Sequence, residues 1–183
     1  MEQFRQWERE GLQPPRIAVN ISPLQLRHKD FVVTVERVLS AAGDRPVALE
    51  LEITENIIMS DIDANILKLR AVKEMGVEVS IDDFGTGYSS LSYLSRLPVS
   101  ALKIDRWFIT NMDKSPVDLG IISTILTLGR SLDLKVIAEG VETAAQASLL
   151  KLLKCDEIQG YLISRSVPAE EAEILLRSGP FAI

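Results

Sequence analysis

The chain has 183 residues, of which 46% are hydrophobic and 25% charged, and its formal net charge is −6. This length and composition are typical of one folded domain with a sizeable core, so we predict a single domain over residues 1–183. The acidic balance argues against a protein that binds DNA or RNA nonspecifically, because such proteins are basic. No apolar run is long enough to span a membrane and no signal peptide is recognisable, so we expect no membrane segment.

Cysteine and histidine are almost absent from the sequence. Cys155 is the single cysteine, which excludes an internal disulfide and fits a reducing compartment, so we expect a cytoplasmic protein. Cys155 and the single histidine, His28, do not supply a structural zinc site. We interpret His28 as a surface residue and Cys155 as a small buried hydrophobe, and we expect Trp7 and Trp107 to anchor packing.

Strands and helices are predicted to alternate along the chain. The expected strands cover residues 16–22, 47–54, 77–81, 100–105, 135–139 and 156–163. The expected helices cover residues 3–10, 30–42, 61–75, 89–97, 115–132, 143–154 and 170–178. This alternation predicts parallel βαβ units, arranged as a doubly wound sheet or as most of a (β/α)8 barrel.

A polar residue near the carboxyl end of each expected strand separates these two folds. The residues are Asn20, Glu52, Asp82, Lys103, Glu139 and Gln159. In a barrel such positions converge on one site at the carboxyl-terminal face, whereas the outer strands of an open sheet contribute less. The pattern therefore favours a TIM-like barrel.

The stretch 81–91 carries the strongest local signal. Strict alternation places Asp82 and Asp83 on opposite faces of their strand. Two adjacent carboxylates repel each other unless a cation lies between them, and Gly85 and Gly87 permit a close approach of backbone to a ligand. An ordinary turn is the alternative, because Asp and Gly are common turn residues.

Six ordered motifs make the chain resemble an EAL domain over essentially its whole length. They are Asn20-Ile21-Ser22, Glu52-Ile53-Thr54-Glu55, Asp82-Asp83-Phe84-Gly85-Thr86-Gly87, Lys103-Ile104-Asp105, Glu139-Gly140-Val141-Glu142 and Gln159-Gly160-Tyr161. The resemblance implies a modified TIM barrel and a phosphodiesterase that opens cyclic-di-GMP to linear pGpG with two Mg²⁺ or Mn²⁺ ions. Hard oxygen ligands suit these ions.

The resemblance also implies roles for individual residues. The implied metal ligands are Asn20, Glu52, Asp82, Asp83 and Glu139, with Asp82 bridging the two ions. Lys103 matches a lysine that holds the attacking water, and Gln159 matches a residue beside that water and the scissile phosphate. Glu55 matches an acid that anchors the 82–87 loop, a loop associated in this family with metal binding and dimer contacts. Taken one at a time, each residue also has an ordinary structural explanation, such as a turn or a solvent-facing charge.

The sequence departs from the family pattern before Asn20. No Glu-Ala-Leu segment is present, so the first metal-binding Glu and the first two barrel strands are missing from these 183 residues. Two hypotheses follow: a phosphodiesterase with weak or absent turnover alone, or a degenerate module that binds cyclic-di-GMP or a protein without turnover. A sensory or GGDEF-type domain is a candidate upstream neighbour.

The missing strands predict two unpaired edges, at residues 16–22 and 157–163. Val19 and Leu51 are expected to be partly uncovered beside the first edge. Exposed edges and apolar patches favour pairing with another chain, so we expect a homodimer or larger oligomer.

Overall fold

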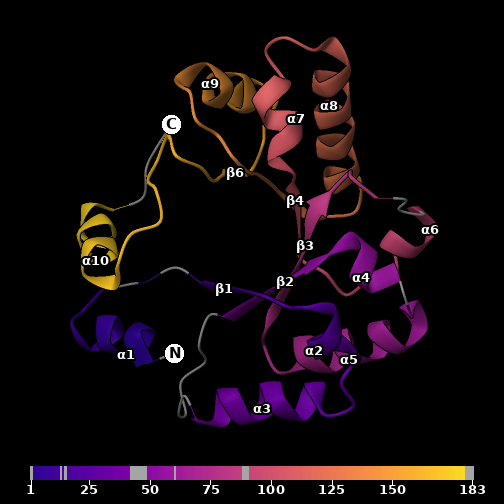
Figure 1. Cartoon of the computed structure of the whole chain (residues 1–183), viewed down its shortest axis with the longest axis vertical. Coiled ribbons are helices and arrows are strands. Elements are labelled where there is room, and N and C mark those ends of the chain that lie inside the picture. The colour runs from indigo at the N-terminus through magenta and orange to yellow at the C-terminus, as the bar shows by residue number, and fades with distance from the viewer. Residues whose placement is uncertain are drawn as a thin grey trace.

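The computed structural model describes residues 2–12, 14, 16–41, 49–59, 61–87 and 91–179. Within these residues it contains one sheet of six parallel strands in the order β1-β2-β3-β4-β5-β6. The strands are β1 (Ile17–Asn20), β2 (Leu49–Thr54), β3 (Glu78–Phe84), β4 (Ala101–Ile104), β5 (Lys135–Ala138) and β6 (Glu157–Ile158). The sheet curls into a half-barrel with helices beside it, which confirms the predicted partial TIM-like α/β fold (Figure 1).

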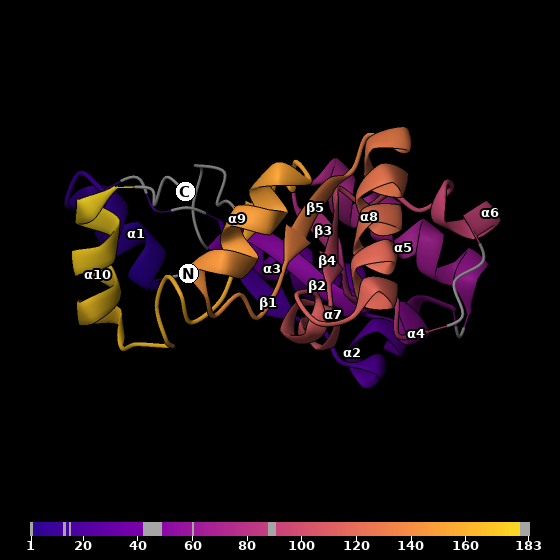
Figure 2. The ribbon, with the colours of Figure 1, turned by 90° about the horizontal axis from the view of Figure 1, so that it is seen from above.

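Helices connect every pair of successive strands. With α1 before the first strand and α10 after the last, the helices of the described residues are α1 (Glu2–Arg9), α2 (Pro23–Arg27), α3 (Phe31–Ala41), α4 (Glu55–Met59), α5 (Ile62–Glu74), α6 (Leu91–Leu94), α7 (Arg106–Asn111), α8 (Pro116–Ser131), α9 (Ala144–Leu152) and α10 (Ala169–Ser178). Several begin where the sequence supplies a cap. The Thr143 hydroxyl accepts from Gln146 N at the start of α9, and the Ser115 hydroxyl accepts from Asp118 N at the start of α8. The terminal helices α1 and α10 lie side by side, away from the sheet, in both views (Figures 1 and 2). None of the helices in the described part of the chain is long and apolar enough to cross a membrane.

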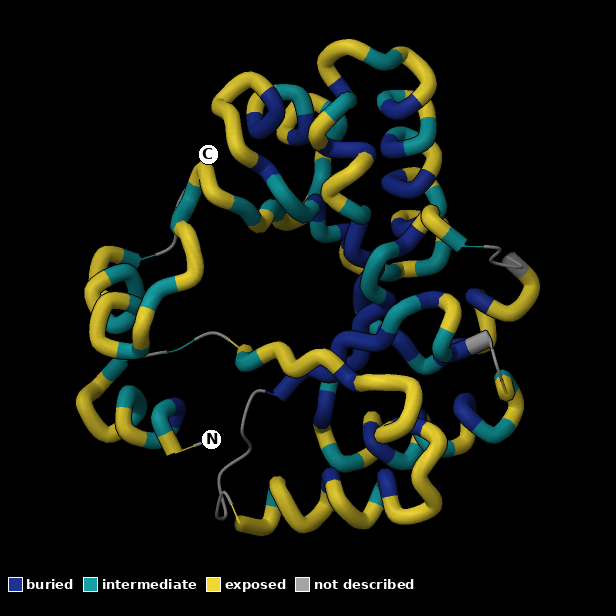
Figure 3. The backbone as a smooth tube through the Cα atoms, viewed as in Figure 1, coloured by how far each residue is buried: buried dark blue, intermediate teal, exposed yellow. Residues whose placement is uncertain are grey.

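The two faces of the sheet differ in chemistry. One face packs against the helices: Val79 and Leu102 are fully buried there with Leu69 of α5 and Ile122 of α8. The opposite face, which we call the inner face, carries the alternate residues, among them the polar residues Glu50, Glu52, Ser80, Asp82 and Lys103. Burial is deepest along β2 to β4, where the backbone tube is dark blue, and β1 is largely exposed (Figure 3). The hydrophobic core therefore supports the middle of the sheet better than its first strand.

Several element boundaries differ from the sequence expectations. The last strand covers two residues instead of 156–163, because the chain turns at Gly160, where Ile163 N donates to Gly160 O at 3.0 Å. The short helices α2, α4 and α7 were not predicted, since five or six residues carry too little periodicity to reveal a helix. The predicted ends at Val47 and Ser89 lie outside the described residues.

Expectations about single side chains also met mixed outcomes. His28 is exposed as predicted, and Val19 at β1 is 41% exposed. Leu51 was expected to be partly uncovered, but it is only 3% exposed, because it lies on β2, which is paired on both sides. Trp107 does not anchor the core: it is 58% exposed on α7, and its neighbour Phe108 takes the buried position. Cys155 is half-buried.

Candidate functional site

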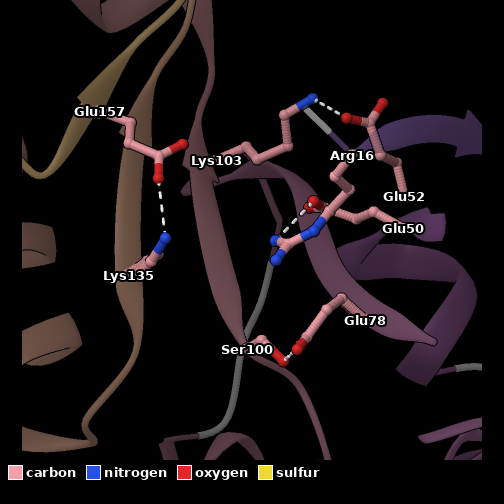
Figure 4. A network of polar contacts seen from close by, with 8 residues as sticks. All are labelled: Arg16, Glu50, Glu52, Glu78, Ser100, Lys103, Lys135 and Glu157. Carbon is pink, nitrogen blue, oxygen red and sulfur yellow. Dashed lines mark hydrogen bonds and ion pairs between the residues drawn. The ribbon is translucent and has the colours of Figure 1, made fainter. Parts of the chain in front are cut away.

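Lys103 is the centre of a polar cluster at the carboxyl ends of β2 to β5. Its Nζ lies 2.5 Å from Glu52 Oε1, 2.6 Å from Glu139 Oε1 and 3.7 Å from Asp82 Oδ1. The lysine stands on β4, so its side chain reaches across β3 to Glu52 on β2 (Figure 4). Glu139 follows β5 directly, and its backbone N–H donates to Ile104 O at 3.2 Å. The curled sheet thus brings acids from three strands to one ammonium group.

A β-bulge at the end of β3 places two adjacent acids at this cluster. Ile81 pairs with Leu102 and Phe84 with Ile104, so Asp82 and Asp83 together oppose the single residue Lys103. Asp83 has φ +52°, and its N–H donates to Asp82 Oδ1 at 3.1 Å. The strict alternation predicted from sequence, with the two acids on opposite faces, is therefore wrong at this point.

Three carboxylates of the cluster converge closely enough to share a metal ion. One oxygen from each of Asp82, Asp83 and Glu139 lies within 4.8 Å of the other two. All three side chains are partly buried, and the donors are hard oxygens, which suit Mg²⁺, Mn²⁺ or Ca²⁺. The structure therefore brings these three predicted ligands together. Glu52 lies beside them and is linked to them by Lys103.

Burial and ion pairing shift the pKa values of the cluster in opposite directions. Burial acts to lower the pKa of Lys103, but hydrogen bonds to Glu139 and Glu52 outweigh it and raise the pKa above the ordinary lysine value. Burial raises the pKa of Glu139 above its ordinary value, although Lys103 opposes the shift. Burial, the neighbouring Asp82 charge and a hydrogen bond with Asp105 raise the pKa of Asp83. A cation at the acids would offset these costs.

Glu55 lies under the loop that follows β3. It is the first residue of α4, is 2% exposed, and accepts a hydrogen bond from Gly85 N at 3.3 Å through Oε2. A Cβ at Gly87 would lie 2.7 Å from Glu55 Oε1, so this close approach requires glycine. Glu55 therefore fixes the start of the loop that carries the two acids.

Asn20 and Gln159 stand at the margins of the cluster. Asn20 pairs with Glu52 in the β1–β2 ladder but is exposed on the edge strand. Gln159 is exposed just beyond β6, where its N–H donates to Ala138 O at 2.8 Å and its carbonyl accepts from Val141 N at 3.0 Å. Both residues lie at the same end of the sheet as the acids, and within the described part of the chain neither side chain hydrogen-bonds to them.

Sequence reasoning missed a second tier of polar contacts on the inner face. Figure 4 shows Arg16 directed at Glu50, Ser100 at Glu78 and Lys135 at Glu157. The Arg16 Nη1–Glu50 Oε2 distance is 3.2 Å, and the Lys135 Nζ–Glu157 Oε1 distance is 2.9 Å. Period-two alternation places the charged members of these pairs on the face of Glu52 and Lys103, but it places Ser100 on the opposite face.

Asp105 belongs to the motif Lys103-Ile104-Asp105, but no role was predicted for it. Its Oδ1 accepts a hydrogen bond from Trp107 N at 2.7 Å, which caps α7. Asp105 also helps to raise the pKa of Asp83, so this cap adjoins the acid pair on β3. An Asp immediately before a short helix was the available signal for the cap.

The comparisons with known proteins agree with this geometry. The model of the EAL domain family matches residues 1–166. The bifunctional diguanylate cyclase/cyclic di-GMP phosphodiesterase MucR of Pseudomonas aeruginosa is 48% identical over 169 residues, which are 92% of this chain and 25% of MucR. The cyclic di-GMP phosphodiesterase NbdA of the same organism is 46% identical over 166 residues, covering 91% of this chain and 21% of NbdA.

Solved structures give the same result. The MucR phosphodiesterase in complex with cyclic-di-GMP has a TM-score of 0.89 and 48% identity, and the match covers 93% of this chain and 69% of that chain. A manganese and cyclic-di-GMP complex of Klebsiella pneumoniae BlrP1 has a TM-score of 0.77 and 30% identity, covering 89% of this chain and 41% of that chain. The chain spans about a quarter of the length of the curated relatives it matches. On these matches, the chain belongs to the EAL domain family.

Proposed function

We propose that this chain is the catalytic part of a cyclic-di-GMP phosphodiesterase, hydrolysing the cyclic dinucleotide to linear pGpG. The observation that carries the proposal is the convergence of Asp82, Asp83 and Glu139 around Lys103. Two relatives at 46–48% identity are named as cyclic di-GMP phosphodiesterases, and MucR was solved with that ligand. Water adds its oxygen to phosphorus, the bond from phosphorus to the 3′ oxygen breaks, and the proton ends on that oxygen.

The residues present fit a pair of Mg²⁺ or Mn²⁺ ions. Asp82, Asp83 and Glu139 offer converging carboxylates, and Glu52 and Asn20 face each other in the neighbouring ladder. Asp82 would be placed to serve both ions, because its strand lies between β2, which carries Glu52, and the pair β4 and β5, which leads to Glu139. When bound, two such ions lower the barrier to hydrolysis by stabilising negative charge on the attacking and leaving oxygens.

The remaining residues orient the reactants. Lys103 holds the attacking water and stabilises developing negative charge as a point charge. Gln159, at the margin of the cluster, positions the same water and the scissile phosphate through its amide. Glu55 holds the 82–87 loop at Gly85 and thereby keeps Asp83 in its left-handed conformation.

The folded unit proposed for this activity is a single domain over residues 1–183. Because the curated relatives are about four times longer, further domains of the GGDEF type are candidate partners in a larger polypeptide. A cytoplasmic location, where the cyclic dinucleotide is a bacterial second messenger, follows from this function.

A hydrolysis assay tests the proposal, with purified chain, cyclic-di-GMP and Mn²⁺ and with separation of pGpG from substrate. We expect slow formation of pGpG that a chelator stops. Lys103→Ala should reduce kcat by about 150- to 1,000-fold with little change in substrate affinity, the loss typical of removing one donor to a developing oxyanion. Lys135→Ala is the matched control, because Lys135 forms an exposed pair with Glu157 on the same sheet.

Binding without turnover is the outcome that supports the second function, a module that recognises cyclic-di-GMP or a protein. Calorimetry with cyclic-di-GMP would then show binding while no pGpG forms at any Mn²⁺ concentration. If neither binding nor hydrolysis occurs, both forms of the proposal are wrong.

A further inference from the structure

The ammonium group of Lys103 lies at the point where the acids of the cluster converge. The Nζ atom contacts Glu52 at 2.5 Å and Glu139 at 2.6 Å, and Asp82 Oδ1 lies 3.7 Å away. These acids come from three different strands, so a single charge links β2, β3 and β5. The lysine side chain is 3% exposed, which shields the contacts from water.

The charge balance requires such a cation. Glu52, Asp82, Asp83 and Glu139 contribute four negative charges within one partly buried region, and like charges at this spacing repel strongly. An ammonium group has three donors, and two of them point at the oxygens of Glu52 and Glu139. Nζ therefore stabilises the negative charge on these oxygens, as a bound cation would.

A cation and Lys103 compete for the same atoms. Glu52 and Glu139 are both proposed metal ligands, and one oxygen of each already contacts Nζ, so an ion bound through these oxygens would share them with the ammonium group. Repulsion between the two positive charges would drive Nζ toward solvent or substrate when an ion takes these oxygens. This displacement would also free the donors with which Lys103 holds water.

We propose that Lys103 is a built-in counter-cation, which keeps the carboxylates together and sets the affinity of the site for divalent ions by competing with them for Glu52 and Glu139. This inference rests on the proposed function only in the identity of the ions. It gives Lys103 a role in assembling the site in addition to its role at the water.

Metal affinity and thermal stability, measured on the same samples, test the inference. Lys103→Met removes the charge and keeps the chain length. Without divalent ions it should lower the melting temperature by roughly 6–20 °C, because breaking a buried ion pair leaves uncompensated charge. Titrated with Mn²⁺ by calorimetry, it should bind at least about tenfold more tightly than the parent chain, since a like charge has gone. Lys103→Arg keeps the charge and should stay near the parent in stability without gaining affinity.

Lys135→Met is the matched control, because its pair with Glu157 is about half exposed on both sides, and its melting temperature should change by at most about 2–4 °C. If Lys103→Met does not fold in a chelator but folds with Mn²⁺, the inference holds, because the ion has replaced the lysine. Failure to fold under both conditions, or unchanged or weaker Mn²⁺ affinity in the folded variant, overturns it. Two further outcomes separate this inference from the proposed function. If the parent chain binds Mn²⁺, Asp82→Asn does not, and Lys103→Met binds with the affinity of the parent, only this inference is wrong. If neither the parent nor any variant binds Mn²⁺, the metal site of the proposed function is wrong as well.

Discussion

The middle of the sheet, at the carboxyl ends of β2 to β5, is more deeply buried than the outer strands β1 and β6. In the middle of the sheet, Val79 and Leu102 are fully buried, and the acids above them converge on one lysine. At β1, Val19 is 41% exposed and lines a groove of about 530 Å³ between the strand and helices α2 and α3. Strand β6 covers only two residues.

This contrast divides the proposed site residues into two groups. The residues proposed for metal and water depend on strands paired on both sides, whereas Asn20 and Gln159 depend on strands that have one partner each. Backbone pairing on both sides restricts the position of a strand end more than pairing on one side. We therefore expect the central acids to keep their geometry under perturbations that displace Asn20 or Gln159.

The largest effect is expected at Asp82, in the central region. Asp82→Asn should weaken Mn²⁺ binding by at least about 100-fold, because it removes the carboxylate that we propose serves both ions. Glu78→Gln, four residues earlier on the same strand, is the control and should leave binding within about threefold, since Glu78 is paired with Ser100 away from the acids. Calorimetry measures both, and equal Mn²⁺ binding by the two variants would sink the metal assignment.

Truncating one valine in each region compares their packing directly. Val79→Ala should lower the free energy of unfolding by about 2–3 kcal/mol, because a fully buried side chain leaves a cavity. Val19→Ala should lower it by less than about 1 kcal/mol, because Val19 is already partly in water. Urea denaturation of the two variants gives the values, and similar losses would show that β1 is as well packed as β3.

The pH dependence of metal binding sharpens the comparison within the central acids. The raised pKa values of Asp83 and Glu139 mean that the folded chain binds protons more tightly than the unfolded chain. Lowering the pH through these raised values should therefore weaken Mn²⁺ binding by up to about tenfold per pH unit for each proton displaced, starting above the ordinary carboxylate range. The same protonation should stabilise the chain without ions. Calorimetry over a pH series that extends down into the ordinary carboxylate range checks the first point; a flat profile contradicts it.

The smallest effect concerns the edge itself. If β1 and its groove pair two copies, as we predict, the apparent mass by light scattering should rise with concentration over the micromolar range. Val19→Lys should shift the distribution toward the monomer without loss of folding, because a charged residue on an edge strand opposes pairing. A monomer at every concentration for the parent chain would refute the predicted self-association.

Periodicity was sufficient to predict the middle of this fold. Alternation in Leu49–Thr54 identified Glu52 as a residue directed at the candidate site, because each strand position there has one environment. The same rule failed at Asp83, since an extra residue in β3 moves it beside Asp82, and a bulge leaves no periodic signal in a short strand. The exposed Trp107 was misassigned because residue type alone does not say which of two adjacent aromatics faces the core.

The site was predictable for a different reason. Glu52, Asp82, Lys103 and Glu139 were identified from their motifs, yet no motif indicated that Lys103 would contact three acids. Those contacts depend on the curl of the sheet, which is set by packing among residues distant in sequence. The pairing of Arg16 with Glu50 depends on the same long-range geometry, whereas the cap formed by Asp105 is a local contact.

Cys155 makes the β5–β6 junction accessible to chemical labelling. Its thiol lies 3.4 Å from Val136 O and 3.3 Å from Glu157 O, and burial raises its pKa to about 11. At neutral pH the thiolate is therefore scarce, and a maleimide should react slowly while the junction is closed. Because this is the single cysteine of the chain, the labelling rate counts the transient openings of one defined edge. The two-residue strand β6 thus has an adjacent reporter of local unfolding.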